Sequence, residues 1–236
     1  MCVSPPFLSV IIPVFRDTDE LSALLRMLRA HNRQNRIEIV VVNGDAQDCG
    51  LQELRIQYRD VHWIDSPRGR GRQMNAGARA SVASWLMFLH ADVRLHPDWL
   101  SVIEEAELKS EVVGGAFRFS LPTKRLFARV IEWCVAARVR WFTLPYGDQA
   151  FFVRRAAFDR IGGFSPLPLM EDVDFIRRLA VVGRLWFPDM TVTVSPRRWE
   201  KDGWIRRTIS NLALLALYFC GVSPARLSRW YEREQQ

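Results

Sequence analysis

The feature that most constrains the fold is an apolar run at residues 85–89 that ends abruptly in His90, Ala91 and Asp92. Such a run, without polar alternation, is typical of a strand buried on both faces, as in parallel sheets covered by helices. In open sheets of this kind, ligands bind beyond the carboxyl ends of the strands. The run therefore predicts a binding site where this strand ends.

A second acidic cluster lies at residues 169–174 and contains Glu171, Asp172 and Asp174. Nearby prolines and the pair Gly162-Gly163 indicate a loop that opens a helix over residues 173–182. Two separate acidic points on one sheet suggest one carboxylate for a metal ion and another for a proton.

The order of elements predicts an α/β fold. Apolar runs predict strands over 8–14, 37–42, 61–64, 113–120 and 150–153, and helical spacing predicts helices over 73–83, 99–108 and 125–141. Alternating strands and helices imply a mostly parallel sheet with helices on both faces, whose loops after strands one, two and four share one rim. The second half is less regular, and we expect it to shape a substrate pocket, with Trp133 and Trp186 in the core.

Composition limits the function class. With 236 residues, 49% of them hydrophobic and 25% charged, the chain suits one α/β domain with two lobes. The net charge of +7 comes almost entirely from arginine, which favours an anionic ligand or an anionic membrane surface. The arginines are scattered rather than gathered in one stripe, so we expect no nucleic-acid partner.

Cysteine spacing and the first residues indicate the compartment. The four cysteines are far apart and form no C-x-x-C pair, which argues against a zinc knuckle and a disulfide framework. The first six residues lack the basic and apolar regions of a secretion signal. We therefore expect a cytoplasmic protein with reduced thiols.

Residues 206–222 form a strongly apolar segment with basic residues at its start. It is shorter than the roughly 20 apolar residues of a spanning helix. One interpretation is an amphipathic helix that rests on the inner face of the membrane and brings a lipid acceptor to the protein. The other, which we prefer, is a core helix or the contact of a homodimer.

Several short motifs occur in a specific order: residues 9–14, the turn after 40–42, Gly71 to Gly77, His90 to Asp92, residues 146–149, residues 168–172 and residues 197–200. In this order the chain resembles family 2 glycosyltransferases of the GT-A fold. It is most similar to a small bacterial subgroup, selenodomain-associated transferase 2. The resemblance implies a Rossmann-like GT-A domain over 8–196 and a C-terminal helical segment over 197–236. Within the domain, residues 8–110 would be the nucleotide-binding half and residues 111–196 the acceptor half.

The resemblance implies transfer of a sugar from a nucleotide-diphosphate sugar, aided by Mn²⁺ or Mg²⁺. Asp92 is the expected metal ligand. His90 stands where much of the family has the first acid of an Asp-x-Asp motif, and it is either a ligand or a histidine hydrogen-bonded at a strand end. An imidazole suits Mn²⁺ better than Mg²⁺, so we favour manganese slightly.

By the same resemblance, Asp172 is the base that takes the proton of the acceptor hydroxyl, and Glu171 orients the acceptor or the base. An acid at this position also suits the start of a helix, where it satisfies free N–H groups. Direct attack by the acceptor would invert the anomeric centre.

Donor binding is expected at Pro13, Asn43, Asp45, Arg70, Arg72, Asn75, Ala91, Asp92 and Arg198, and acceptor binding at Gly147, Asp148, Gln149 and Trp199. Arg68, Arg70 and Arg72 alternate with glycine, which predicts a flexible basic loop that either grips a diphosphate or is only a solvated turn. Asn43 replaces the family's usual aspartate, so the base of the nucleotide stays open. Gly147-Asp148 alternatively forms an ordinary tight turn.

Two other functions fit parts of the pattern. A sugar nucleotidyltransferase would share the sheet and the metal but needs a glycine-rich phosphate loop after strand one, where residues 13–16 supply none. A non-catalytic basic module would bind nucleic acid or anionic lipid in a salt-dependent manner and would not depend on Asp92 or Asp172.

Overall fold

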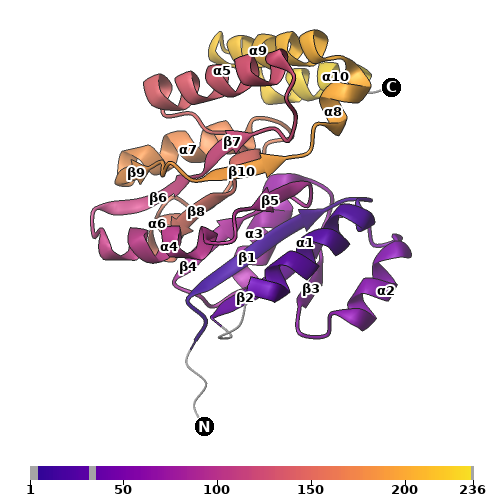
Figure 1. Ribbon diagram of the computed structural model, residues 1–236, viewed down its shortest axis with the longest axis vertical. Helices are drawn as coiled ribbons and strands as arrows, with labels where there is room; N and C mark the ends of the chain where they lie inside the picture. Colours follow the sequence, from indigo (N-terminus) through magenta and orange to yellow (C-terminus); the bar gives the residue numbers. More distant parts are fainter. Residues whose placement is uncertain (1–4, 32–35, 235–236) are drawn as a thin grey trace.

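A seven-stranded sheet lies at the centre of the computed structural model, which describes residues 5–31 and 36–234 (Figure 1). The strands follow the order β3 (His62–Asp65), β2 (Ile37–Asn43), β1 (Leu8–Val14), β4 (Trp85–Phe88), β8 (Phe151–Arg154), β6 (Val112–Ala116) and β9 (Arg184–Trp186). Neighbouring strands run parallel except at β8, which is antiparallel to both β4 and β6. The expected mostly parallel α/β sheet is confirmed.

A second sheet has three strands, in the order β5 (Val93–Leu95), β10 (Thr191–Val194) and β7 (Arg118–Ser120). The single strand expected over residues 113–120 is wrong, because the chain changes sheets at Phe117. Before this residue β6 pairs with β8, and after it β7 pairs with β10. Phe117 is itself buried and packs edge-on against Phe152. The apolar run therefore continues through the point at which the chain leaves one sheet for the other, which is why it suggested a single strand.

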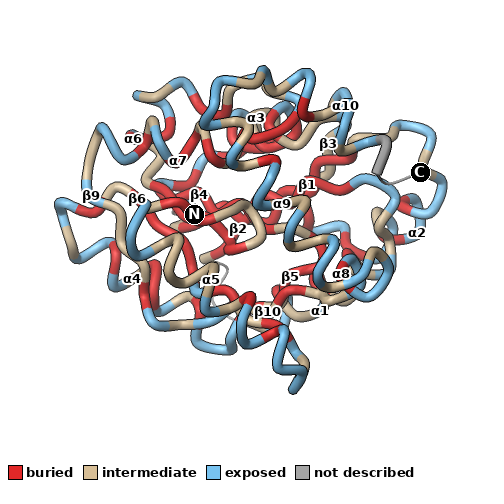
Figure 2. Tube along the Cα trace, turned by 90° about the horizontal axis from the view of Figure 1, so that it is seen from above, coloured by how far each residue is buried: buried red, intermediate tan, exposed pale blue. Residues whose placement is uncertain are grey.

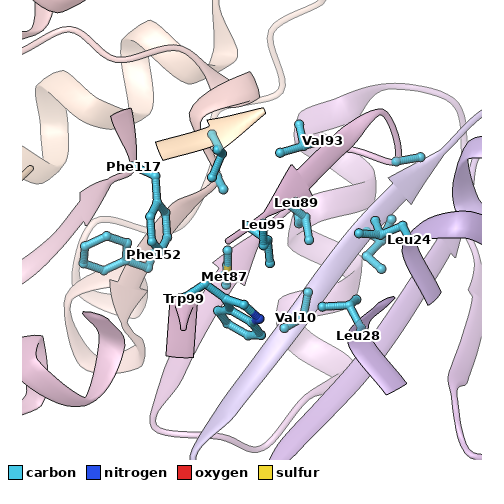
Figure 3. Close-up of a cluster of buried hydrophobic side chains, with 14 of the residues drawn as sticks. Val10, Leu24, Leu28, Met87, Leu89, Val93, Leu95, Trp99, Phe117 and Phe152 are labelled. Carbon is cyan, nitrogen blue, oxygen red and sulfur yellow. The ribbon is translucent and has the colours of Figure 1, made fainter. Parts of the chain in front are cut away.

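Both faces of the main sheet are buried. Alternate side chains of a strand point to opposite sides, so each strand contributes to two cores. Val10 and Met87 join one core, while Ile11 and Phe88 join the other. The first face is covered by α1 (Thr18–His31), α2 (Gly50–Gln57) and α4 (Trp99–Leu108), the second by α3 (Arg70–Ala80), α6 (Arg155–Arg160) and α7 (Glu171–Val182). Figure 3 shows Leu24 and Leu28 of α1 and Trp99 of α4 in the first core. Figure 2 shows that buried residues follow the strands.

Helix α3 begins at Arg70, three residues earlier than expected. Gly69 precedes it with a φ of +137°, and its carbonyl accepts a hydrogen bond from the N–H of Gln73 over 2.9 Å. The flexible loop predicted for Arg70 and Arg72 is therefore wrong, because both residues lie in the first turn of a helix. A Cβ at Gly71 would lie 3.1 Å from the carbonyl oxygen of Ser165, so this turn packs closely against the loop before α7.

Four helices lie together at one end of the molecule, beyond β7 and β10 (Figure 1). They are α5 (Leu126–Phe142), α8 (Arg197–Asp202), α9 (Trp204–Phe219) and α10 (Pro224–Glu234). A core position for residues 206–222 is wrong, because α9 buries Leu214 while Ile209 and Leu212 are exposed, whereas the dimer contact stays a prediction. Trp133 of α5 is likewise 66% exposed rather than in the core. Within residues 5–31 and 36–234, no helix combines the length and apolar character needed to cross a membrane.

Candidate active site

The candidate site lies where the strand order reverses. The chain moves outward from β1 through β2 to β3, and α3 then returns it to β4 on the other side of β1. Crevices at such switch points are the usual ligand sites of open α/β sheets. A cavity of about 120 Å³ lies here, lined by Arg70, His90, Asp92, Tyr146, Gly147, Asp148, Leu169, Met170, Glu171, Asp172, Val194, Ser195, Arg198, Trp199, Arg207, Asn211, Leu214 and Tyr231. We call it the catalytic cavity.

His90 and Asp92 reach this cavity from a turn rather than from the end of the strand. β4 stops at Phe88, and the N–H of Val93 bonds the carbonyl of His90 over 3.1 Å. Asp92 is 9% exposed, and its carboxylate lies 3.7 Å from the guanidinium of Arg198. The turn therefore presents a largely buried carboxylate to a half-exposed cationic side chain.

The His90 imidazole is neutral near pH 7. Burial lowers its pKa to about 4, and the positive charges of Arg70 and Arg198 act in the same direction. A neutral imidazole can ligate a metal ion. A Cβ at Gly147 would lie 3.0 Å from Nε2 of His90, which shows how closely the backbone of residues 147–149 approaches this ring.

These side chains fit a divalent cation only in part. In the described residues, no group of three or more His, Cys, Asp or Glu side chains is arranged to hold a metal ion. Asp92 and His90 supply one carboxylate and one neutral imidazole at the cavity wall. That donor set suits an ion which takes its remaining ligands from substrate oxygens, as cations in phosphate-transfer sites commonly do.

Asp172 connects two segments of the opposite wall. Its Oδ1 accepts the N–H of Val173 over 2.8 Å, within the first turn of α7, and its Oδ2 accepts the N–H of Gly147 over 3.0 Å. Helix α7 starts at Glu171, two residues earlier than expected, after Met170 with a φ of +66°. Asp172 thus occupies the helix-start position that the sequence allowed, while its second oxygen faces the short helix η1 (Gly147–Gln149).

Glu171 points into the protein and pairs with Arg70. Its side chain is 4% exposed, and Oε1 lies 3.0 Å from Nε of Arg70. Burial raises the pKa of Glu171, although the guanidinium of Arg70 opposes the shift. Asp148 also lines the cavity, and burial raises the pKa of its carboxyl to about 6. Burial thus raises the pKa of two of the acids that line the cavity.

Nine of the expected site residues line the catalytic cavity: His90, Asp92, Arg70, Arg198, Gly147, Asp148, Glu171, Asp172 and Trp199. Seven others do not line it: Pro13, Asn43, Asp45, Arg72, Asn75, Ala91 and Gln149. Of the latter, Pro13 and Asn43 lie near the carboxyl ends of β1 and β2, at the same edge of the sheet, and Arg72 is exposed on α3.

Several of these seven residues use their polar groups within the protein. The Asn75 amide forms two hydrogen bonds with the backbone of Phe164. Its NH2 group donates to the carbonyl of Phe164 over 2.8 Å, and its oxygen accepts the N–H of Phe164 over 2.9 Å. Gln149 donates to the carbonyl of Phe117 over 2.9 Å and accepts the N–H of Tyr146 over 3.1 Å. In this structure the two amides therefore bind backbone groups of the protein and hold these segments in place.

The loop after β2 is held in a similar way. Asn43 donates to the carbonyl of Asp45 over 2.7 Å and to Oδ1 of Asp65 over 3.0 Å. Asp45 accepts Nε of Arg16 over 2.6 Å, and this hydrogen bond lowers the pKa of the Asp45 carboxyl. The side chains expected to contact the nucleotide thus shape the loop between β2 and α2.

Sequence reasoning missed the contribution of the C-terminal helices to the cavity. Arg207, Asn211 and Leu214 of α9 and Tyr231 of α10 all line it. Arg207 pairs with Asp202 over 3.0 Å and donates to the hydroxyl of Tyr231 over 2.7 Å. No local motif marks these residues, because only tertiary packing brings them to the site.

Comparison with known proteins identifies relatives across most of the chain. A family model described as Glycosyl transferase family 2 matches residues 9–169. The probable glycosyltransferase YdaM of Bacillus subtilis (strain 168) is 24% identical over 229 residues, covering 86% of this chain and 54% of YdaM. Glycosyltransferase AglE of Haloferax volcanii is 28% identical over 126 residues, covering 50% of this chain and 41% of AglE. The chain thus spans about half the length of these curated relatives.

Solved structures show the same fold. A mannosyltransferase of Pyrobaculum calidifontis, PcManGT, in complex with GDP-Man and Mn²⁺, superposes with a TM-score of 0.68 at 18% identity, covering 97% of this chain and 70% of that one. Residues 1–349 of S. aureus TarS, in complex with UDP-GlcNAc, superpose with a TM-score of 0.60 at 17% identity, covering 80% of this chain and 58% of that one. The expected GT-A-like α/β fold is confirmed.

Proposed function

Because the chain belongs to glycosyl transferase family 2, we propose that it transfers a sugar from a nucleotide-diphosphate donor to an oxygen of an acceptor. One observation carries the proposal: a single cavity brings Asp92 and Arg198 together with Asp172. The first two residues suit a leaving diphosphate, and the third suits an acceptor that loses a proton. The order of the motifs supports membership in the selenodomain-associated subgroup within the family.

The donor side of the cavity is suited to a diphosphate. Arg198 is 52% exposed and is held only loosely by Asp92, so its guanidinium is free to form the paired hydrogen bonds that phosphate oxygens accept. Asp92 and His90 would hold a divalent cation, Mn²⁺ rather than Mg²⁺ because of the imidazole. When bound, that cation would offset the negative charge that the departing diphosphate acquires. PcManGT, which holds GDP-Man and Mn²⁺, supports this donor class.

The acceptor side supplies the base. In the proposed step, the acceptor oxygen forms a bond to the anomeric carbon while the bond from that carbon to the diphosphate oxygen breaks. The bonding electron pair leaves with the diphosphate, and the acceptor's proton passes to the carboxylate of Asp172. Attack on the face opposite the leaving group inverts the anomeric centre. The N–H of Gly147 keeps Oδ2 of Asp172 at the cavity wall, which supports this role.

Glu171 and Arg70 would act as positioning residues. Their ion pair links the first turn of α7 to the first turn of α3, next to Asp172. A buried pair of this kind fixes both side chains, since breaking it would leave a charge unpaired. We propose that Glu171 orients the base through this link and that Arg70 adds positive charge near the diphosphate.

A thermal-shift screen tests the proposed function. The purified protein would be heated with GDP-mannose, UDP-N-acetylglucosamine and other nucleotide sugars, with and without Mn²⁺. A ligand that binds only the folded state raises the midpoint. We expect at least one nucleotide sugar to raise it in the presence of Mn²⁺, and Asp92→Asn to abolish the rise.

Asp98→Asn is the matched control, because Asp98 is an exposed carboxylate outside the catalytic cavity. This variant should keep the full shift. If no nucleotide or nucleotide sugar raises the midpoint of the wild-type protein under either condition, the proposed function is wrong.

A further inference from the structure

A second, larger cavity lies between α5 and α9 and has a volume of about 850 Å³. We call it the α5–α9 groove. It is lined by Phe119, Ile131, Trp133, Cys134, Val135, Ala137, Arg138, Trp141, Phe142, Leu144, Tyr146, Asp148, Arg177, Trp199, Thr208, Asn211, Leu212, Leu215, Ala216 and Phe219. Figure 1 shows α5 and α9 side by side at the end of the molecule beyond β7. The function proposed above assigns no role to this groove.

The groove borders the catalytic cavity. Tyr146, Asp148, Trp199 and Asn211 line both spaces, so the polar end of a molecule in the groove would lie next to the cavity that contains Asp172. The two spaces differ in character. Seven of the 18 residues that line the catalytic cavity are Asp, Glu or Arg, whereas most residues of the groove are aliphatic or aromatic.

The size and chemistry of the groove match a ligand site. Sites for small molecules have volumes of roughly 300–1,000 Å³ and are mostly apolar, with a few polar groups that fix orientation. Trp133, Trp141 and Phe142 of α5 and Leu212 and Phe219 of α9 are all exposed despite their size. Apolar surface gathered in this way marks an interaction site, because leaving it in water is unfavourable.

We propose that the acceptor is an amphiphile whose apolar chain occupies the α5–α9 groove while its oxygen nucleophile lies in the catalytic cavity. This inference rests on the proposed function, and it names the class of acceptor: a lipid or a similar long-chain molecule with a polar end. The exposed apolar side chains would also suit a second copy of the chain or a bilayer surface. Only an acceptor molecule also accounts for the position of the groove beside the catalytic cavity.

Fluorescence titration with dansylaminoundecanoic acid, a probe with one apolar chain, tests the groove directly. Ala216→Trp would fill it, because Ala216 lines the groove. Ala213→Trp is the matched control, because Ala213 is an exposed alanine on the same helix that does not line the groove. We expect Ala216→Trp to weaken probe binding at least tenfold and Ala213→Trp to change it less than twofold.

A chain-length series links the groove to transfer. Octyl glucoside, used below its micelle concentration, should displace the probe and accelerate release of nucleoside diphosphate from a donor that the thermal-shift screen identifies. Methyl glucoside should do neither at the same concentration. Nucleotide-sugar binding, measured separately by calorimetry, should stay within twofold of wild type in both tryptophan variants.

The outcomes separate the two proposals. If nucleotide sugars bind but the probe does not bind, or binds equally to both variants, the amphiphile inference is wrong and the proposed function stands. Equal effects of octyl and methyl glucoside also overturn the inference. A dimer in light scattering that the probe does not dissociate would instead assign the groove to a second copy. If no nucleotide sugar binds, the proposed function fails whatever the probe does.

Discussion

The backbone N–H of Gly147 donates a hydrogen bond to Oδ2 of Asp172 over 3.0 Å, which joins η1 to the first turn of α7. The two residues are 25 positions apart in the chain, and both line the catalytic cavity. A side chain whose partner is a rigid backbone group is held in one orientation. The orientation of the proposed base, Asp172, therefore depends on the position of Gly147.

Gly147→Ala should reduce transfer without unfolding the protein. The added Cβ would lie 3.0 Å from Nε2 of His90, so this ring must shift, whereas its 3.7 Å separation from Oδ2 of Asp172 is an ordinary contact. Displacement of reacting groups by about 1 Å costs on the order of 10²-fold in rate. Because the ring of His90 has to shift by less than this, steady-state kinetics should show a smaller loss in kcat, of about tenfold, and a Tm within a few degrees of wild type would confirm that the fold persists.

Asp172→Asn should lower kcat by about 10²–10⁴-fold, the usual contribution of a positioned general base. Donor binding, measured by calorimetry, should stay within about threefold of wild type, because the amide has nearly the same shape and its oxygen still accepts one of the two N–H groups, that of Gly147 or that of Val173.

Asp174→Asn is the matched control for this prediction. Its carboxylate pairs with Arg178 over 2.7 Å and accepts the hydroxyl of Ser165 over 2.6 Å, and it does not line the cavity. This variant should lose stability and keep most of its kcat. Equal losses of kcat in the two variants would remove Asp172 from the mechanism.

Asp148→Asn should stabilise the protein in a pH-dependent way. Burial raises the pKa of the Asp148 carboxyl from 3.8 to about 6, so the folded state holds this proton more tightly than the unfolded chain does. The contribution of Asp148 to stability is therefore fully present below about pH 4 and is lost as the pH rises through about 6. A neutral amide avoids that loss.

We therefore expect the Tm of Asp148→Asn to exceed that of wild type at about pH 8 and the difference to disappear near pH 4. The exposed variant Asp189→Asn serves as the control and should show no such trend. A difference for Asp148→Asn that stays constant over this range would contradict the burial of its carboxyl.

Gly77→Ala should destabilise the fold, because α3 packs against the sheet at this glycine. The added Cβ would lie 2.4 Å from Cγ2 of Ile11 and 3.0 Å from Cγ2 of Val42. Overpacking of this kind costs about 1–3 kcal/mol, which denaturant unfolding can measure. Arg79→Ala, on an exposed position of the same helix, should change the free energy of unfolding by less than about 0.5 kcal/mol.

Hydrophobic patterning predicted six of the seven strands of the central sheet and missed the short edge strand β9. β1 has the expected bounds, α4 spans the expected residues 99–108, and the turn that carries His90 and Asp92 lies at the predicted edge. Two other errors lie in segments whose local pattern is compatible with two different structures. One apolar run became β6 and β7 in different sheets, and the alternating arginines and glycines became the first turn of α3.

About half of the residues that line the candidate site could be predicted from the sequence. Asp92 and Asp172 could be inferred because strand ends and helix starts are local features, and the structure brings both to one cavity. Asn75 and Gln149 could not be separated from ligand-binding amides, because an amide bonds backbone groups and substrates equally well. Arg207 and Tyr231 carry no local signal, since packing of α9 and α10 alone brings them to the cavity.

The central claim is that Asp92 takes part in binding a nucleotide-diphosphate sugar together with a divalent cation. Calorimetric titration of the donor from the thermal-shift screen, into wild type and Asp92→Ala, with Mn²⁺ or with a chelator, tests it most directly. We predict that wild type binds the donor at least tenfold more tightly with Mn²⁺ than with chelator, and that Asp92→Ala loses this dependence. Equal affinities in all four titrations would contradict the account.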